Sequence, residues 1–310
     1  MGVDTSVRIG TLLLQNPVMP ASGTFGFGRE MADIWDIRQL GAIVSKGVTP
    51  LPREGNDAPR VAETACGMLN SVGLQNPGID AFIRDELPFM SALGVPVVVN
   101  AAGHCAEDYA AICEKLDSTP VAAIELNLSC PNVRTGCMNI GTDPAQVCLA
   151  VRAARAATSK PLWVKLTPNV THITDIAGAA EASGADAVSL INTLLGMRID
   201  IRTRRPVLAN NTGGLSGPAV FPVALRMVNE VARAVRIPVI GIGGIRSGED
   251  ALEMILAGAS AVEVGTANLI RPTACQDIIR EFRNLMDEYH IDSVEEVIGT
   301  ALRWGESIRT

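Results

Sequence analysis

The chain has 310 residues, of which 47% are hydrophobic and only 4% aromatic, and its formal net charge is −7. This length suits one domain that repeats a strand–helix unit about eight times. The acidic balance argues against a nucleic-acid-binding protein, which needs a basic face, and no apolar run approaches the roughly 18 residues of a membrane-spanning helix.

The first predicted elements are two short apolar strands at residues 7–9 and 12–14, which are joined by a turn at Gly10-Thr11. Short aliphatic runs then recur along the chain, most of them close to Gly or Pro, as is typical of buried parallel strands. Eight such strands are predicted, at residues 18–21, 42–46, 96–100, 122–127, 162–166, 187–191, 238–242 and 261–264.

Helical segments are predicted between these strands. One begins near Asp143, with a proline in its first turn. A second covers residues 248–257, with Ser247 as its N-cap and Gly258 at its C-terminus. A third covers residues 273–289, where apolar side chains spaced three and four residues apart form one stripe.

Eight alternations of strand and helix predict a parallel sheet with right-handed crossovers. We favour a closed (β/α)₈ barrel (TIM barrel), with residues 1–310 as a single domain, over a doubly wound open sheet, because the strands number eight. The hairpin at residues 7–14 could plug the N-terminal end of the barrel. The stretches at residues 47–77 and 192–217 are too long for plain connectors and are expected to build a site or a lid.

Polar side chains gather at the predicted C-terminal ends of the strands, where the catalytic groups of a barrel lie. Packing does not explain why aliphatic strands end in lysine or asparagine at five of eight places, so we expect a site there. The residues concerned are Lys46, Asn100, Asn127, Lys165 and the pair Asn192-Thr193.

The last two strands end differently, in Gly243-Gly244 and Gly265-Thr266. Glycines let backbone N–H groups approach an anion, and the loops after strands seven and eight form the recurring phosphate site of barrels. The sequence therefore predicts a ligand with a phosphate group. The glycines do not form a GxGxxG motif, so no dinucleotide-binding fold is inferred.

Cys130 is a candidate catalytic group, because it lies on the polar loop after the fourth strand. A thiol there can act as a base if its pKa is depressed or if a closed site presents the substrate proton directly. The seven cysteines form no CxxC pair and no Cys/His cluster, so we expect no metal site, no disulfide framework and a reducing cytoplasm. Only His104 among the histidines lies near the predicted mouth, and we favour a structural role for it.

Four motifs follow one another along nearly the whole chain. They are Asn70-Ser71-Val72-Gly73-Leu74, Asn127-Leu128-Ser129-Cys130-Pro131-Asn132, Asn211-Thr212-Gly213-Gly214-Leu215-Ser216-Gly217, and Gly243-Gly244 followed by Gly265-Thr266. Together they resemble the class 1 dihydroorotate dehydrogenases, and residues 191–215 are most similar to the class 1B catalytic subunit. The resemblance implies oxidation of dihydroorotate to orotate in de novo pyrimidine (UMP) biosynthesis.

The same resemblance implies FMN as the cofactor on this chain. FMN would be bound by Ser22, Lys46, Gly47, Asn100, Asn127, Lys165, Ile191, Gly217, Gly243, Gly244, Gly265 and Thr266. Orotate would be bound by Lys46, Asn70, Ser71, Val72, Gly73, Leu74, Asn127, Asn192 and Thr193, and amides suit a ring with adjacent carbonyl and N–H groups. Cys130 would remove the C5 proton while a hydride leaves C6 for the flavin.

Class 1B also implies a partner, an electron-transfer subunit that carries FAD and a 2Fe–2S cluster and passes electrons to NAD⁺. A homodimer of this chain within a heterotetramer is the expected assembly. Class 2 enzymes carry an N-terminal membrane-associated extension, for which this chain has no room before its first strand.

Three other interpretations stay open. They are a class 1A enzyme, which is a homodimer using fumarate, a flavin barrel acting on dihydrouracil-like rings, and an IMP-dehydrogenase-like barrel without flavin. A non-catalytic phosphate-binding barrel is disfavoured by the polar strand ends. The chain also departs from the family pattern after Cys130, because Cys137 replaces a glycine and Ile140 an aromatic residue. Cys137 is a second thiol, but only Cys130 lies in the Ser-Cys-Pro-Asn context.

Overall fold

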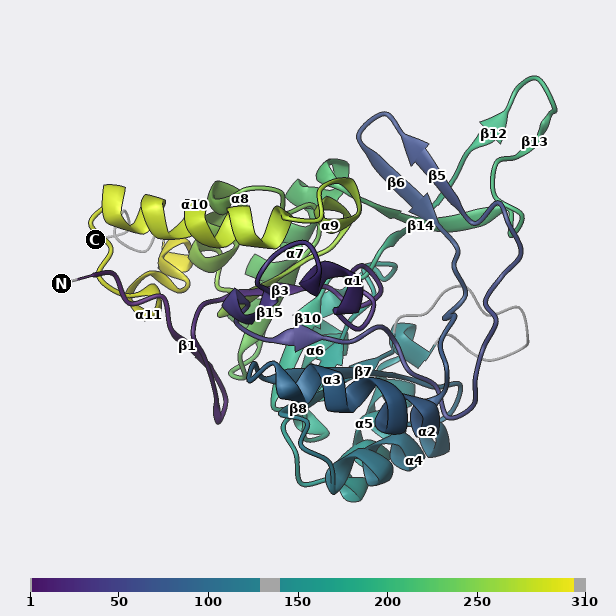
Figure 1. Cartoon of the computed structure of the whole chain (residues 1–310), viewed down its shortest axis with the longest axis horizontal. Helices are drawn as coiled ribbons and strands as arrows, with labels where there is room; N and C mark the ends of the chain where they lie inside the picture. The colour runs from purple at the N-terminus through teal and green to yellow at the C-terminus, as the bar shows by residue number, and fades with distance from the viewer. Residues whose placement is uncertain (1, 129–139, 304–310) are drawn as a thin grey trace.

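The computed structural model describes residues 2–128 and 140–303. Its centre is an eight-stranded parallel sheet in the order β3-β16-β15-β10-β9-β8-β7-β4. The strands are β3 (Val18–Pro20), β4 (Ile43–Val44), β7 (Val97–Ala102), β8 (Ala123–Asn127), β9 (Leu162–Lys165), β10 (Ala187–Leu190), β15 (Val239–Ile242) and β16 (Ala261–Val264). The Gly41 N–H donates to the Val18 carbonyl at 2.9 Å and so joins β4 to β3. The predicted (β/α)₈ barrel is therefore confirmed (Figure 1).

Helices alternate with these strands and surround the barrel (Figure 1). They are α1 (Arg29–Ala32), α2 (Ile79–Ala81), α3 (Leu87–Ala92), α4 (Ala106–Asp117), α5 (Pro144–Ala157), α6 (Ile173–Ala182), α7 (Phe221–Ala234), α8 (Gly248–Leu256), α9 (Thr266–Ile270), α10 (Ala274–Glu288) and α11 (Val294–Val297). The predicted caps are confirmed. The Asp143 side chain accepts from the Ala145 N–H at the start of α5, and Ser247 accepts from the Asp250 N–H at the start of α8.

Several strands begin or end one or two residues from their predicted bounds, and two of these differences concern predicted site residues. Strand β7 continues two residues past Asn100, because the chain after β4 pairs with it. The Val48 N–H donates to the Asn100 carbonyl, and the Ala102 N–H donates back to Val48. Asn100 therefore lies within the strand and not at its end. Lys46, in contrast, lies two residues beyond the end of β4.

The predicted N-terminal hairpin is present as β1 (Val7–Ile9) and β2 (Leu12–Leu14), paired antiparallel. Its Val7, Ile9 and Leu14 side chains belong to the buried core. A small hollow between the hairpin and the barrel is lined by residues that precede β4 and β7, including Gly41 and Pro96. The hairpin thus lies against the N-terminal end of the barrel, opposite the predicted site.

The two long stretches between strands meet in a second sheet. Strands β5 (Val61–Thr64) and β6 (Gly67–Asn70) come from the first stretch, and β11 (Leu194–Met197) and β14 (Thr212–Ser216) come from the second. They form a four-stranded antiparallel sheet in the order β11-β14-β6-β5. We call this the roof sheet.

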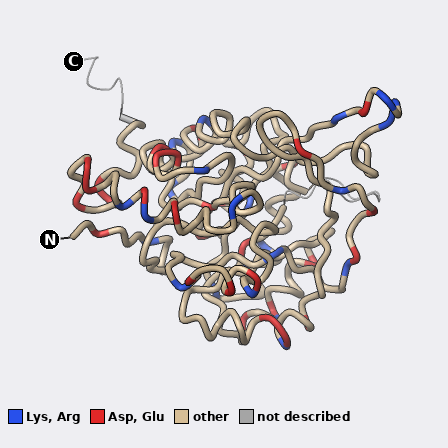
Figure 2. Tube along the Cα trace, turned by 45° about the horizontal axis from the view of Figure 1, so that its top comes forward, with Lys and Arg blue, Asp and Glu red and all other residues tan. Residues whose placement is uncertain are grey.

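A short hairpin of β12 (Ile199–Asp200) and β13 (Arg205–Pro206) projects from the roof sheet (Figure 1). Figure 2 shows that basic residues gather along this projection, and the segment contains four exposed arginines, Arg198, Arg202, Arg204 and Arg205. Within the ranges that the structure describes, no helix has both the length and the apolar character to cross a membrane.

Candidate active site

A cavity of 490 Å³ lies between the C-terminal ends of the barrel strands and the roof sheet. It brings together predicted residues from every part of the chain. Those that line it are Ser22, Lys46, Gly47, Asn70, Val72, Gly73, Leu74, Asn100, Asn127, Lys165, Ile191, Asn192, Thr193, Gly217, Gly243, Gly244, Gly265 and Thr266. The polar residues predicted at the strand ends and the glycines after the last two strands therefore lie around one continuous cavity.

One predicted residue that the structure describes, Ser71, is not among those lining the cavity. Ser71 is fully buried, and its hydroxyl has no hydrogen-bond partner within the described residues. Its backbone N–H donates to the Arg60 carbonyl instead. Cys130 lies outside the described residues, as does Cys137. His104 also stays outside the cavity lining, and its Nε2 lies 2.5 Å from Nη1 of Arg53.

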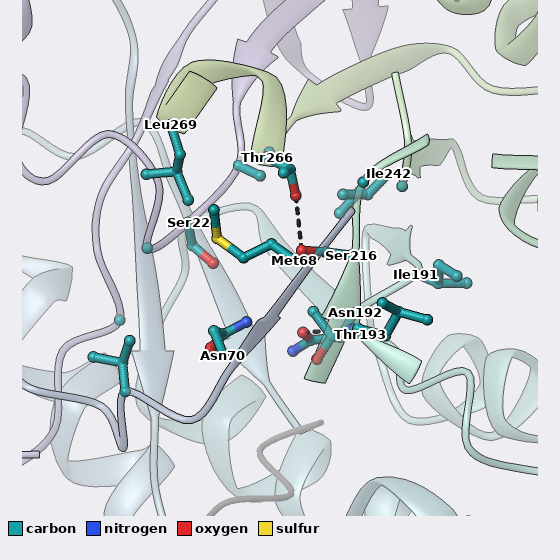
Figure 3. A pocket seen from close by; sticks show the side chains of 18 of the residues that line it. Ser22, Met68, Asn70, Ile191, Asn192, Thr193, Ser216, Ile242, Thr266 and Leu269 are labelled. Atoms are coloured by element: carbon teal, nitrogen blue, oxygen red, sulfur yellow. Dashed lines mark hydrogen bonds between the residues drawn. The ribbon is translucent and has the colours of Figure 1, made fainter. Parts of the chain in front are cut away.

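The cavity has an apolar side that the sequence analysis missed. Met68 and Leu215 come from adjacent roof strands, and Val220, Ile242 and Leu269 come from the barrel side. Figure 3 shows Met68 and Leu269 near Ser22 and Thr266 at one end of the cavity, and Asn70, Asn192 and Thr193 at the other. These apolar residues lie close to predicted site residues in the sequence. No local sequence pattern, however, shows that the two long stretches at residues 47–77 and 192–217 pair with each other.

At one end of the cavity the backbone is rich in glycine. Gly217, Gly243 and Gly244 have φ angles of 103°, 123° and 78°, which favour glycine. A Cβ on Gly244 would come within 2.7 Å of the Phe221 backbone nitrogen, so packing alone requires glycine there. Gly265 is different, because a Cβ there would meet no protein atom closer than Ala21 Cβ at 3.7 Å. Protein packing does not explain that glycine, and the space beside it can receive a ligand.

A hydrogen bond connects this glycine-rich end to the roof sheet. The Thr266 hydroxyl donates to the Ser216 hydroxyl at 2.7 Å (Figure 3). Thr266 begins α9 and Ser216 ends β14. The bond fixes the end of the roof strand against the barrel loop that follows β16.

Amide side chains dominate the opposite end of the cavity. The Asn127 Nδ2 donates to Asn100 Oδ1 at 3.3 Å, and Asn192 Oδ1 accepts from the Thr193 N–H at 2.7 Å. Asn169, outside the cavity, donates to the Thr193 carbonyl and accepts from the Leu195 N–H. Asn169 therefore holds the start of β11 in place. This end offers donors and acceptors suited to a small polar ring.

Two lysines line the cavity in different electrostatic surroundings. Burial lowers the pKa of Lys46, and the nearby positive charge of Arg60 lowers it further. Burial alone would also lower the pKa of Lys165, but the carboxylates of Glu125 and Glu263 more than offset this and raise it. Lys165 is therefore a fixed cation at neutral pH.

Glu125 and Glu263, which the sequence did not indicate as site residues, lie in β8 and β16 with no exposed surface. Glu263 lies 2.8 Å from Lys165 Nζ, and Glu125 lies 3.7 Å from it. Glu125 also accepts from Asn100 at 2.6 Å. A glutamate inside an otherwise aliphatic strand was the available signal, because such strands bury both faces.

Comparison with known proteins agrees with this geometry. The family model for dihydroorotate dehydrogenase matches residues 5–286. Three similar proteins are each named dihydroorotate dehydrogenase B (NAD(+)), catalytic subunit. That of Alkaliphilus oremlandii is 55% identical over 94% of this chain and 97% of its own length. That of Geotalea uraniireducens is 54% identical over 96% of this chain and 98% of its own length. That of Bacillus pumilus is 51% identical over 95% of this chain and 95% of its own length.

The family match covers most of the chain, and these relatives align over nearly their full length. The resemblance to the class 1B catalytic subunit, read from the motifs, is confirmed by them. The chain belongs to the dihydroorotate dehydrogenase family.

Proposed function

We propose that this chain oxidises dihydroorotate to orotate with bound FMN, as a step of pyrimidine biosynthesis. The observation that carries the proposal is the composition of the cavity beneath the roof sheet. It combines a glycine-rich end that suits a phosphate, an apolar side that suits a planar ring system and an end of amides that suits a pyrimidine. The names of the relatives support this substrate.

The residues of the cavity fit FMN in three respects. Gly265 leaves space that no protein atom fills, beside the Thr266 hydroxyl, and this space suits the phosphate. Lys165 places a buried cation in the cavity wall, where it can stabilise negative charge on a reduced ring. Bound FMN would supply the acceptor for the hydride that leaves C6 of dihydroorotate.

The chain's own residues would bind the substrate and move its proton. Asn70, Asn127, Asn192 and Thr193 are proposed to hold the pyrimidine ring, and Lys46 to contact the ring and the cofactor. The roof sheet covers them and limits access of water. We propose Cys130 as the base, whose Sγ takes the C5 proton as the C6 hydride leaves.

The choice of base is tested with two matched variants. Cys130→Ser is expected to slow reduction of the bound flavin by dihydroorotate steeply at neutral pH, because an alcohol ionises far less readily than a thiol and so supplies almost no anionic base. Cys137→Ser is expected to leave that rate nearly unchanged. Stopped-flow absorbance measures both, and equal losses in the two variants contradict the assignment.

We further propose that the electrons reach NAD⁺ through a partner subunit carrying FAD and a 2Fe–2S cluster, with this chain as a homodimer within a heterotetramer. The words "catalytic subunit" and "NAD(+)" in the relatives' names support a second subunit and this acceptor. The test is NAD⁺ reduction by the purified chain with and without such a partner. Rapid turnover with fumarate and no partner would favour class 1A instead.

A cheaper experiment tests the cofactor itself. The purified chain is expected to be yellow, or to become so with added FMN, and to release FMN on denaturation. A colourless chain that takes up no FMN would favour the flavin-free alternative. A cytoplasmic location stays a prediction, with which the five free cysteines of the described residues agree.

A further inference from the structure

The eight barrel strands are almost entirely aliphatic, and the ionisable residues within them meet at one point. The strand residues contain only three ionisable side chains, Glu125 in β8, Lys165 in β9 and Glu263 in β16. All three are at least 97% buried. Burying a charged side chain is costly unless it is paired. The meeting of three such side chains from separate strands inside the barrel is therefore not accidental.

This cluster lies directly behind the cavity. Lys165 lines the cavity, and its Nζ also lies 3.4 Å from the Ser22 hydroxyl, which lines it too. Asn100, a third lining residue, donates its amide to Glu125 at 2.6 Å. Glu125 and Glu263 do not line the cavity themselves. They act on a ligand only through the lysine and the asparagine.

The two carboxyl groups have unequal surroundings. Glu125 accepts from Ser189 at 2.5 Å with one oxygen and from Asn100 with the other, and it also faces Lys165. Glu263 accepts from the Lys165 ammonium and lies against the Glu125 carboxyl, and its Oε1 has no hydrogen-bond partner among the described residues. The surroundings of Glu125 suit a carboxylate, and those of Glu263 suit a carboxylic acid.

Charge balance points the same way. Two ionised carboxylates against one ammonium would leave a net negative charge in a buried place, which is strongly unfavourable. Burial and the neighbouring Glu125 raise the pKa of Glu263 well above its usual range, and Lys165 offsets this only in part. No other barrel strand supplies a charge, since the residues of β3, β4, β7, β10 and β15 are all non-ionisable.

We propose that Glu125 and Glu263 share one proton at neutral pH, carried mainly by Glu263, and act as positioning residues that keep Lys165 cationic in a neutral cluster. One cation and one anion then balance. Lys165 is held at the cavity wall, and Asn100 is oriented with its amide nitrogen toward Glu125 and its oxygen toward Asn127.

The functional consequence rests on the proposed function, because it concerns bound FMN. A reduced flavin carries more negative charge than an oxidised one, so a positive change in the cluster favours the reduced form. A shared proton makes the cluster resistant to loss of either carboxyl, because the remaining one ionises beside Lys165. Only loss of both leaves the ammonium uncompensated.

The first experiment needs no cofactor. Infrared difference spectra of the FMN-free chain at pH 7, in H₂O and D₂O, report the carbonyl stretch of a protonated carboxylic acid. We expect this band in the native chain and its loss in both Glu125→Gln and Glu263→Gln. The control Glu281→Gln removes a carboxylate that caps the Gly248 N–H away from the cavity, and it should keep the band. A native chain without the band, or a band that survives both substitutions, overturns the proposal.

The second experiment measures the affinity of the chain for oxidised and reduced FMN. Each single Gln variant should keep the native ratio of the two dissociation constants. The double variant should favour reduced FMN by at least about tenfold more than the native chain does, because one unpaired charge acts across a buried site. A large change in either single variant means that both carboxylates are ionised and overturns the proposal.

The two experiments separate this proposal from the assignment of the cofactor. Failure of the chain to bind FMN refutes the proposed function, and the infrared band still decides whether the proton is present. Normal FMN binding without the band refutes the shared proton alone. If the double variant does not fold, the single variants still decide the outcome.

Discussion

Replacing Lys165 with methionine tests how the barrel interior tolerates its buried charges. The substitution keeps most of the length of the side chain and removes the ammonium, which lies 2.8 Å from Glu263 and 3.7 Å from Glu125. Breaking a buried ion pair by removing one partner costs about 3–5 kcal/mol, because the other charge stays buried without compensation. This cost is a large part of the free energy of unfolding of a typical native protein, which is roughly 5–15 kcal/mol, but the variant should still fold and can be measured.

The loss of stability caused by Lys165→Met should depend on pH in a defined direction. Without the ammonium, the negative charge of the cluster is no longer compensated, so the folded variant favours binding one more proton than the native chain does, whereas carboxyl groups of the unfolded chain ionise above about pH 4.5. The folded state then binds more protons than the unfolded state. Stability therefore falls as pH rises, by about 1.4 kcal/mol per pH unit for each extra proton retained. The cost of Lys165→Met should be small near pH 5 and large near pH 8.

Urea unfolding at several pH values measures this cost, with the fluorescence of Trp163 as a probe. Trp163 lies two residues before Lys165 in β9 and is fully buried. Adding Glu125→Gln and Glu263→Gln to Lys165→Met should recover much of the stability at pH 8. The control Arg226→Met removes an exposed ion pair with Glu230 and should hardly move the midpoint. A cost below about 1 kcal/mol, or one that does not change between pH 5 and pH 8, would refute the reasoning.

Three further predictions use other parts of the cavity and the barrel. Gly265→Ala should weaken FMN binding in a fluorescence titration, because its Cβ would enter the space proposed for the phosphate, where the nearest protein atom is 3.7 Å away. Gly214→Ala should weaken orotate binding measured by calorimetry, because its Cβ would lie 1.9 Å from Thr193 Oγ1 and displace that side chain. Ser247→Ala should cost about 1 kcal/mol in urea unfolding by removing the cap of α8; unchanged stability would contradict that role.

The sequence predicted the barrel well because its signals are local. Each strand was predicted from an aliphatic run of four to six residues, and two helix starts were predicted from the capping residues Asp143 and Ser247. The strand ends predicted the cavity for a topological reason. Parallel strands place all their C-terminal ends at the same face, so Lys46, Asn127 and Lys165 must come together whatever the details of packing.

The features that the sequence did not reveal depend on distant pairing. Strand β6 pairs with β14, and the paired residues Asn70 and Gly214 are separated by more than 140 positions. No local pattern indicates such a partner. The position of Asn100 inside its strand was missed for a similar reason, because pairing with Val48 lengthens the strand. Glu263 was missed for another reason, because a lone glutamate in an aliphatic strand does not show which charged groups lie beside it on the other strands.

The roof sheet links the two ends of the cavity through one strand. At its C-terminal end β14 passes Ser216, which is bonded to Thr266, and reaches Gly217 beside the proposed phosphate position. Near its middle, Gly214 leaves room for the Thr193 side chain at the proposed substrate position. A Cβ on Gly217 would come within 2.7 Å of the Gly67 backbone, so the neighbouring roof strand touches it closely. Because one strand contacts both positions, we expect a ligand at the glycine-rich end to help hold the groups at the proposed substrate position.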